Sequence, residues 1–295
     1  MAIPAHTRFI LFVIYDREDV LVKVRPLYLP FSACRYFLTK KNMAENEEKI
    51  TVDMPQIAIA VATREQNEGT EKFIKHLQET AGCGIATYIL VNPGGVALTQ
   101  IYNTVMNSDT LPSKILVFMH DDVEFLRNGW GTELLRLFKE NEDYGIIGVA
   151  GSAQFDQNGA WWQYEKKYGQ VLHRKDGKSW LTAFSPLLDK DLQEVCVVDG
   201  LFFAVHLDRV METFDQKIEG FNFYEIDFCL ANYFTHKCKI GVTTNIRLAH
   251  NSIGELKPEW YTNRDYINQK YGSKFPVIVK ESNKKKPQRR GGKKK

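Results

Sequence analysis

The sequence has few cysteines, and none of them forms a recognisable pair. The five are odd in number, lie far apart and contain no CxxC motif, which argues against a disulfide framework and against a zinc knuckle. This pattern fits a reducing compartment, where most of these thiols would be small core residues. They are Cys34, Cys83, Cys196, Cys229 and Cys238.

Long hydrophobic runs are also missing. The longest near the start, Phe9 to Tyr15, has only seven residues, whereas about 20 are needed to span a bilayer. The same stretch is too short for a signal peptide and lacks a small-residue cleavage site. We therefore expect a cytoplasmic protein.

No glycine motif of a phosphate-binding loop is present. Gly94 and Gly95 fit neither GxGxxG nor GxxxxGK[ST], so we expect neither a Rossmann dinucleotide site nor a Walker-type site. A tight turn accounts for the two glycines. A nucleotide could still lie over a strand end without a glycine loop, held by Thr63, Arg64 and Asn92.

Charge is distributed unevenly along the chain. The net charge is +3, but the last twelve residues, Lys284 to Lys295, hold eight of the 39 Lys and Arg, which leaves 31 basic against 36 acidic residues in the remainder. We expect this tail to be disordered. It could reach an anionic membrane surface peripherally. Nucleic acid is the less expected partner, and a solvated tail with no partner fits equally well.

The length of 295 residues and the hydrophobic content of 44% allow one substantial core. One catalytic domain with appendages is therefore expected rather than two equal domains. We place the domain at residues 54–275, after an N-terminal extension of undefined role (1–53) and before a basic tail (276–295). Strand-like segments in the extension suggest an extra hairpin on the main sheet.

Strand-like apolar segments alternate with segments whose apolar residues recur at helical spacing. This order predicts an α/β fold with a doubly wound, mainly parallel sheet flanked by helices. The expected strands are 55–64, 86–91, 115–119, 144–150 and 194–200, and the expected helices are 65–78, 96–106 and 129–140.

The third of these strands stops abruptly at His120, Asp121 and Asp122. Ligands of open α/β sheets bind beyond the carboxyl ends of the strands, so these acids lie where chemistry is expected. Adjacent carboxylates repel each other unless a cation or a proton relieves them, which favours a divalent metal. A turn with a solvated Asp-Asp pair explains the residues equally well.

Further acids and aromatic residues follow. Asp199 ends another strand-like segment, and Glu225 and Asp227 lie in the first turn of a helix, where a carboxylate can act as a cap or as a base. In the weakly periodic region 153–194, the Trp161-Trp162 pair is expected to contact an acceptor.

Four motifs in order resemble those of the GT-A glycosyltransferases, and within these the family-2 branch with its bacterial and viral glycosyltransferase-like relatives. The resemblance covers about residues 54–275. The motifs are Phe118-Met119-His120-Asp121-Asp122-Val123, Val198-Asp199-Gly200, Gly220-Phe221 through Leu230, and His250-Asn251-Ser252.

The resemblance implies a GT-A fold, a sugar donor of the UDP, GDP or dTDP type, and a divalent metal, Mn²⁺ or Mg²⁺. The family's Asp-x-Asp element falls on His120-Asp121-Asp122, with His120 where an Asp is more usual. Asp122 would bind the metal, His120 and Asp121 would lie beside the donor, and His250 would approach the metal from the C-terminal side.

The resemblance also assigns the remaining residues of the site. Thr63, Arg64 and Asn92 would lie by the nucleotide. Asp199 and Gly200 would line the sugar and acceptor pocket, and Glu225 would be the general base, with Asp227 as second choice.

The leading hypothesis is an inverting, metal-assisted glycosyltransferase acting on a hydroxyl of a glycan, a lipid-linked saccharide or a protein. A metal would neutralise the leaving diphosphate while a carboxylate takes the acceptor proton. Two alternatives stay open. One is a non-catalytic module that binds nucleotide sugars or glycans, suggested by His120, and the other is a sugar-phosphate nucleotidyltransferase, whose paired acids also hold metals.

Overall fold

The computed structural model describes residues 9–15, 20–21, 54–109, 111–254 and 256–280. Most of the N-terminal extension and the basic tail from residue 281 lie outside the described residues, so membrane contact through the tail stays a prediction. Within these described ranges, no helix is long and apolar enough to cross a membrane.

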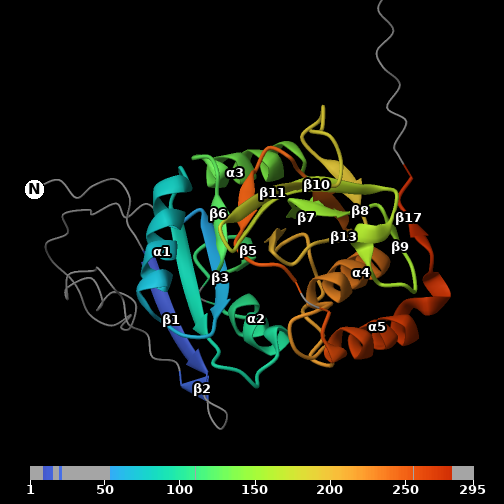
Figure 1. Cartoon of the computed structure of the whole chain (residues 1–295), viewed down its shortest axis with the longest axis horizontal. Helices are drawn as coiled ribbons and strands as arrows, with labels where there is room; N and C mark the ends of the chain where they lie inside the picture. Colours follow the sequence, from blue (N-terminus) through green and yellow to red (C-terminus); the bar gives the residue numbers. More distant parts are fainter. Residues whose placement is uncertain (1–8, 16–19, 22–53, 110, 255, 281–295) are drawn as a thin grey trace, which may run out of the picture.

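A nine-stranded sheet runs through the centre of the molecule, in the order β12-β15-β7-β14-β5-β3-β4-β1-β2 (Figure 1). β1, β4, β3, β5, β7 and β15 run in one direction, and β2, β14 and β12 run against them. The strands are β1 Phe9–Tyr15, β2 Val20–Leu21, β3 Ile57–Thr63, β4 Ile85–Val91, β5 Ile115–His120, β7 Tyr144–Gly148, β12 Gln193–Val195, β14 Phe202–His206 and β15 Lys239–Val242.

The predicted alternation of strands and helices is confirmed in the first half of the domain. β3, β4 and β5 are parallel and are joined by α1 (Glu68–Thr80) and α2 (Leu98–Met106). Nearly every residue of these strands is buried, as expected for parallel strands covered on both faces. The predicted α/β fold with a mixed, mainly parallel sheet flanked by helices is therefore correct. The extension contributes to it, because β1 pairs with β4 and forms a hairpin with β2.

Helices cover both faces of this sheet, as two neighbouring residues of β14 show. Phe202 contacts Trp130 at the start of α3 (Trp130–Glu140), on the face where α1 also packs. Phe203 points the other way, toward Tyr224 and Phe228 of α4 (Tyr224–His236), on the face of α2. Alternate side chains of a strand point to opposite faces, so each helix layer packs on its own set of residues.

A second sheet lies beside the first, in the order β13-β8-β10-β16-β6, with β11 paired to β10. Two of its strands, β10 and β11, come from the weakly periodic region 153–194. Its strands are β6 Val123–Phe125, β8 Ala150–Ser152, β10 Lys167–Lys175, β11 Lys178–Ala183, β13 Val197–Val198 and β16 Leu248–His250.

The strand predicted over 194–200 is in fact divided between the two sheets. β12 pairs with β15 in the large sheet, and β13 pairs with β8 in the small one. The division falls at Cys196, whose backbone N–H donates to Ser152 O. Asp199 therefore follows a strand of the second sheet, and its expected place at the end of a main-sheet strand was wrong.

The C-terminal boundary of the ordered region also differs from the prediction. After α5 (Pro258–Tyr271), β17 (Val277–Ile278) pairs with β9 (Gln154–Phe155), and Val277 and Val279 are buried. Residues 276–280 were placed in the basic tail, but they pack on the domain. β1 and β2 lie at one end of the molecule, and α5 and β17 lie at the other (Figure 1).

We expect Gly169→Ala to destabilise the protein strongly. Gly169 has φ +109, and a Cβ there would lie 2.1 Å from Val149 O and 2.7 Å from Ala150 Cα. The substitution would therefore combine backbone strain, about 1–2 kcal/mol, with overpacking, about 1–3 kcal/mol. Gly177→Ala is the matched control, since Gly177 also has positive φ (+72) but no atom within 4 Å of the added Cβ. Equal losses of unfolding free energy in urea for both variants would contradict this account.

Candidate functional site

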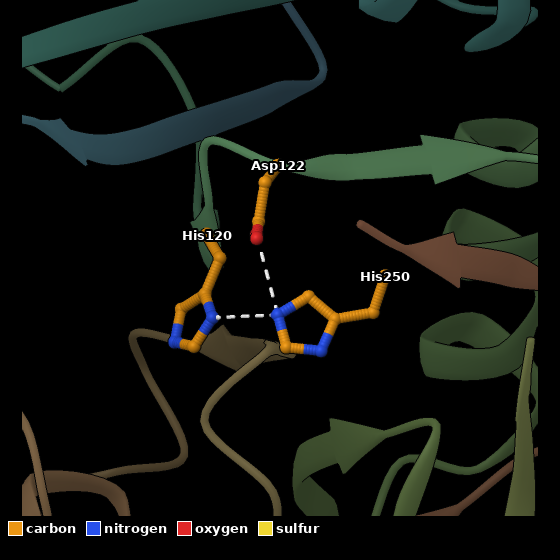
Figure 2. A group of neighbouring side chains, drawn as sticks. All are labelled: His120, Asp122 and His250. Carbon is orange, nitrogen blue, oxygen red and sulfur yellow. Dashed lines mark hydrogen bonds and ion pairs between the residues drawn. The ribbon is translucent and has the colours of Figure 1, made fainter. Parts of the chain in front are cut away.

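Three side chains meet where β5, β6 and β16 come together (Figure 2). His120 is the last residue of β5, Asp122 lies in the turn between β5 and β6, and His250 is the last residue of β16. One nitrogen or oxygen atom from each lies within 4.8 Å of the other two. We call these three residues the His-Asp-His cluster.

Backbone pairing places the cluster. β6 and β16 are antiparallel, with His250 opposite Val123, and the Asn251 N–H donates to Asp122 O at 3.0 Å. On the other side, the His120 N–H donates to Leu201 O at 3.1 Å. Each of the three side chains is therefore carried by hydrogen-bonded backbone rather than by a free loop.

His250 Nε2 has more polar neighbours than it can hydrogen-bond. His120 Nδ1 lies 3.4 Å from this nitrogen, Asp122 Oδ1 lies 3.3 Å from it, and Ser252 Oγ lies 3.1 Å from it. A ring nitrogen carries either one hydrogen or one lone pair, so it can make one good hydrogen bond. Asp122 Oδ1 is buried and has no hydrogen-bond partner among the described residues.

A metal ion fits this arrangement. Ligand atoms that share one ion at about 2.1 Å lie roughly 3.0–3.4 Å from each other, which agrees with the 3.3 and 3.4 Å separations in the cluster. Two imidazoles and one carboxylate favour a divalent transition-metal ion over Mg²⁺, which prefers oxygen ligands. His120, Asp122 and His250 would hold the ion.

The protonation of the cluster is compatible with metal binding. Burial acts to raise the pKa of Asp122, but His250 and Ser252 outweigh it and hold that pKa at about 2. Burial and the nearby His250 lower the pKa of His120. Asp122 is therefore an anion and His120 a neutral imidazole near neutral pH, and these are the forms that bind metals. Burial acts to lower the pKa of His250, but Asp122 outweighs it and raises that pKa, so a metal would have to displace a proton from His250.

Glu225, in the first turn of α4, is half-buried, and one of its carboxyl oxygens, Oε2, is shielded from solvent. Its Oε2 makes no hydrogen bond among the described residues. Burial, with a further contribution from Asp199, raises the pKa of Glu225 to about 8. The N-terminus of a helix favours a charged carboxylate by only about 0.3–1 kcal/mol, so burial prevails over it. A carboxyl group with such a pKa is suited to proton transfer near neutral pH.

Asp199 and Gly200, which follow β13, are neighbours of the site groups. The Asp199 carboxylate interacts electrostatically with His120, His250 and Glu225, and its Oδ1 accepts a hydrogen bond from Leu201 N at 2.8 Å. A Cβ at Gly200 would lie 3.2 Å from Glu225 Cδ. It would lie still closer to Tyr224 Oη, at 2.4 Å, so Gly200 leaves room first for the Tyr224 hydroxyl and then for the Glu225 carboxyl.

Asp227, the second choice for the base, is occupied elsewhere. It is 1% exposed, and its Oδ1 accepts from Lys270 Nζ at 2.8 Å and from Tyr271 Oη at 3.0 Å. Residues two apart on a helix point in very different directions, so Asp227 faces α5 rather than Glu225. Because Lys270 pairs with its carboxylate, Asp227 is less suited than Glu225 to take a proton from an acceptor, although its Oδ2 makes no hydrogen bond among the described residues.

The expected acceptor contact of the tryptophan pair is not supported for Trp161. Trp161 is 3% exposed and packs against Phe184, with ring centroids 5.0 Å apart. Trp162 is half-buried and lies 6.3 Å from the Trp260 ring. Both rings pack against the core, which is where large aromatic side chains are usually stable.

The residues predicted to bind the nucleotide lie at neighbouring strand ends. Thr63 ends β3 one position beyond the pairing of Ala62 with His120, and the Asn92 N–H donates to Thr63 O at 2.7 Å. Arg64 and Asp121 are exposed beside them. The Asn92 side chain instead closes its own turn, with bonds to Val96 O and from Gly94 N.

Two further residues contact the cluster: Ser252, which belongs to the His250-Asn251-Ser252 motif, and His173, which carried no sequence signal. Ser252 lies two residues after His250 and contacts it directly. His173 lies opposite His250 across β10 and β16, with ring centroids 5.9 Å apart. Only the pairing of distant strands brings His173 there, so no local motif could have indicated it.

Comparison with known proteins gives a family match over most of the domain. The model of the family described as "Glycosyltransferase like family" matches residues 57–271. No curated protein matches the chain.

Solved structures that are similar include GalNAc-T7 with UDP, GalNAc and Mn²⁺, at 8% identity and a TM-score of 0.49, covering 74% of this chain and 48% of that one. This chain thus spans about half the length of GalNAc-T7. The mannosyltransferase PcManGT from Pyrobaculum calidifontis in complex with GDP-Man and Mn²⁺ is 9% identical, with a TM-score of 0.41 and coverage of 82% and 69%. A197 from STIV is 11% identical, with a TM-score of 0.40 and coverage of 67% and 86%. Similarity at these identities and TM-scores says nothing about the function of this chain.

We expect Mn²⁺ to raise the melting temperature of the protein through the His-Asp-His cluster. A ligand that binds only the folded state stabilises it by RT ln(1 + [L]/Kd), so the shift should grow with Mn²⁺ concentration. Asp122→Ala and His250→Ala should abolish it. Asp121→Ala is the matched control, since Asp121 is exposed and lies outside the cluster. A shift that survives in Asp122→Ala and His250→Ala would place the metal elsewhere.

Proposed function

The chain belongs to the glycosyltransferase-like family, and from this premise we propose that it transfers a sugar from a nucleotide-diphosphate sugar to a hydroxyl acceptor with inversion at the sugar carbon. The observation that carries the proposal is a metal-type cluster at the end of β5 with a half-buried carboxylate near it, one oxygen of which has no hydrogen-bond partner among the described residues. The cluster would deal with the charge of the leaving diphosphate, and the carboxylate would accept the proton of the acceptor hydroxyl.

The first charge develops on the leaving diphosphate. A divalent cation held by His120, Asp122 and His250 would neutralise it as the bond to the sugar breaks. Thr63, Arg64 and Asp121 lie at the adjacent strand ends, so they are placed to contact the nucleotide and the donor sugar. We take the donor to be of the UDP, GDP or dTDP type.

The second charge is the proton of the acceptor hydroxyl. Glu225 is the residue assigned to remove it, because its carboxyl has a raised pKa, about 8, and an oxygen without a protein partner. Such general-base catalysis is typically worth about 10²–10⁴-fold in rate. Asp227 is less suited to this step, since Lys270 and Tyr271 donate to one oxygen of its carboxylate.

The arrangement of these groups favours inversion. The cluster is built from β5, β6 and β16, whereas Glu225 projects from α4, and Asp199 interacts electrostatically with both. A base on one side of the sugar carbon and the leaving group on the other allow a single displacement.

The rival functions have less support. A non-catalytic binding module was suggested by His120 at an Asp position, but His120 Nδ1 is positioned as a ligand, 3.4 Å from His250 Nε2. A nucleotidyltransferase does not agree with the family of the chain. Release of pyrophosphate from a nucleoside triphosphate and a sugar phosphate would instead show nucleotidyltransferase activity.

We expect Glu225→Gln to bind the donor and Mn²⁺ normally but to lose about 10²–10⁴-fold in transfer rate, because the amide cannot accept the proton. The measurement is single-turnover transfer from a nucleotide sugar, beside calorimetric donor binding. Asp227→Asn is the matched control on the same helix and should retain transfer. Full transfer by Glu225→Gln would remove Glu225 as the base, and loss of donor binding would show a structural role instead.

We also expect Glu225→Gln to be more stable than the wild type at alkaline pH. The folded-state pKa, about 8, lies above the value near 4.3 of a free glutamate, so the folded protein keeps a proton that the unfolded chain has released. Wild-type stability should therefore fall between about pH 4.5 and 8, by up to roughly 1.4 kcal/mol per pH unit.

The neutral amide removes this loss, so the advantage of the variant should be large at pH 8.5 and small at pH 5. Urea unfolding at both pH values measures it. Glu71→Gln serves as control, because Glu71 also lies in the first turn of a helix, α1, but is exposed. An equal advantage at both pH values would rule out the burial of Glu225 as the cause.

A further inference from the structure

Three ring side chains form a row across neighbouring strands of the second sheet. Trp180 of β11 is the register partner of His173 of β10, and His173 is the partner of His250 of β16. Paired residues of adjacent strands point to the same face. The row therefore begins at a member of the His-Asp-His cluster and ends at the edge strand β11.

The rings of this row are in contact. The His173 and Trp180 rings are stacked, with centroids 5.5 Å apart and an interplanar angle of 19°. On its other side, the His173 ring lies 5.9 Å from the His250 ring. The indole thus lies against an imidazole that is itself packed between two rings, so Trp180 has a defined orientation.

Trp180 is nevertheless exposed, at 38%. Its neighbours on the same face of β11 are Lys178 and Thr182, because alternate residues of a strand share a face. An interface for a protein or a lipid would need a contiguous apolar patch. A single aromatic face between hydrogen-bond donors is suited instead to a ligand with both apolar faces and hydroxyl groups.

We propose that Trp180 binds the acceptor by stacking on a pyranose ring of a saccharide, a proposal that rests on the function proposed above. The C–H groups on the face of a sugar ring pack on an indole, and Lys178 and Thr182 can bond to its hydroxyls. Because a second ring, His173, lies between Trp180 and His250, the stacked sugar is not the one that receives the new bond. The acceptor is therefore an oligosaccharide of at least two units.

The test compares Trp180→Ala with Leu181→Ala on an array of defined mono- to hexasaccharides, with UDP or GDP and Mn²⁺ present. Leu181 is the matched control, since it is the next residue of β11, is 58% exposed and points to the opposite face. We expect wild type and Leu181→Ala to bind the same oligosaccharides, and Trp180→Ala to bind them about tenfold more weakly. Trp180→Phe should recover part of the loss, because it restores an aromatic face.

Equal saccharide binding by Trp180→Ala and Leu181→Ala, or no saccharide binding by the wild type, would overturn the inference. Calorimetry of UDP and GDP with Mn²⁺, on the wild type, Trp180→Ala and Leu181→Ala, separates this outcome from failure of the proposed function. Donor binding without dependence of saccharide binding on Trp180 would refute the acceptor role alone. Absence of any nucleotide binding by the wild type would refute the proposed function itself.

Discussion

The pairing of β6 with β16 is the contact on which the candidate site depends. It sets His250 opposite Val123 and joins the Asn251 N–H to Asp122 O, so that two side chains far apart in the chain share one small volume. A slip of one residue would turn the His250 side chain to the other face of the sheet, because strand side chains alternate. The second sheet is therefore necessary to the site, although Asp121 and Asp122 directly follow β5, a strand of the first sheet.

The two carboxylates in the first turn of α4 differ in whether a cation offsets their burial. Burial raises the pKa of both Glu225 and Asp227. Lys270 and Tyr271 donate to Asp227 Oδ1, whereas no cation pairs with Glu225 among the described residues; Asp227 Oδ2 and Glu225 Oε2 both lack a hydrogen-bond partner there. A buried carboxylate without a compensating cation lowers stability, and such a cost is retained where function requires it.

The two sheets contribute to different parts of the site. The large sheet supplies the strand ends of β3 and β5, where polar residues follow buried strands, and the helix α4 that packs against it carries Glu225. The second sheet supplies His250 and, through β10 and β11, a row of rings that leads outward from it. In the proposed function, the donor would lie at the first sheet and the acceptor would extend along the second.

The sequence by itself determined the strands and helices from β3 to α3, except β6, and pointed to Asp122, Glu225 and His250, because periodicity, strand ends and motif order are local properties of the chain. Only the tertiary structure decided which of these groups meet. In the folded protein, His120 lies with Asp122 and His250, and Asp227 forms an ion pair with Lys270. Trp161 is buried, and His173 lies beside the cluster. Each of these outcomes depends on pairing or packing between segments distant in sequence. Local patterns show which residues are apolar or charged, but they do not show which partner satisfies a buried charge.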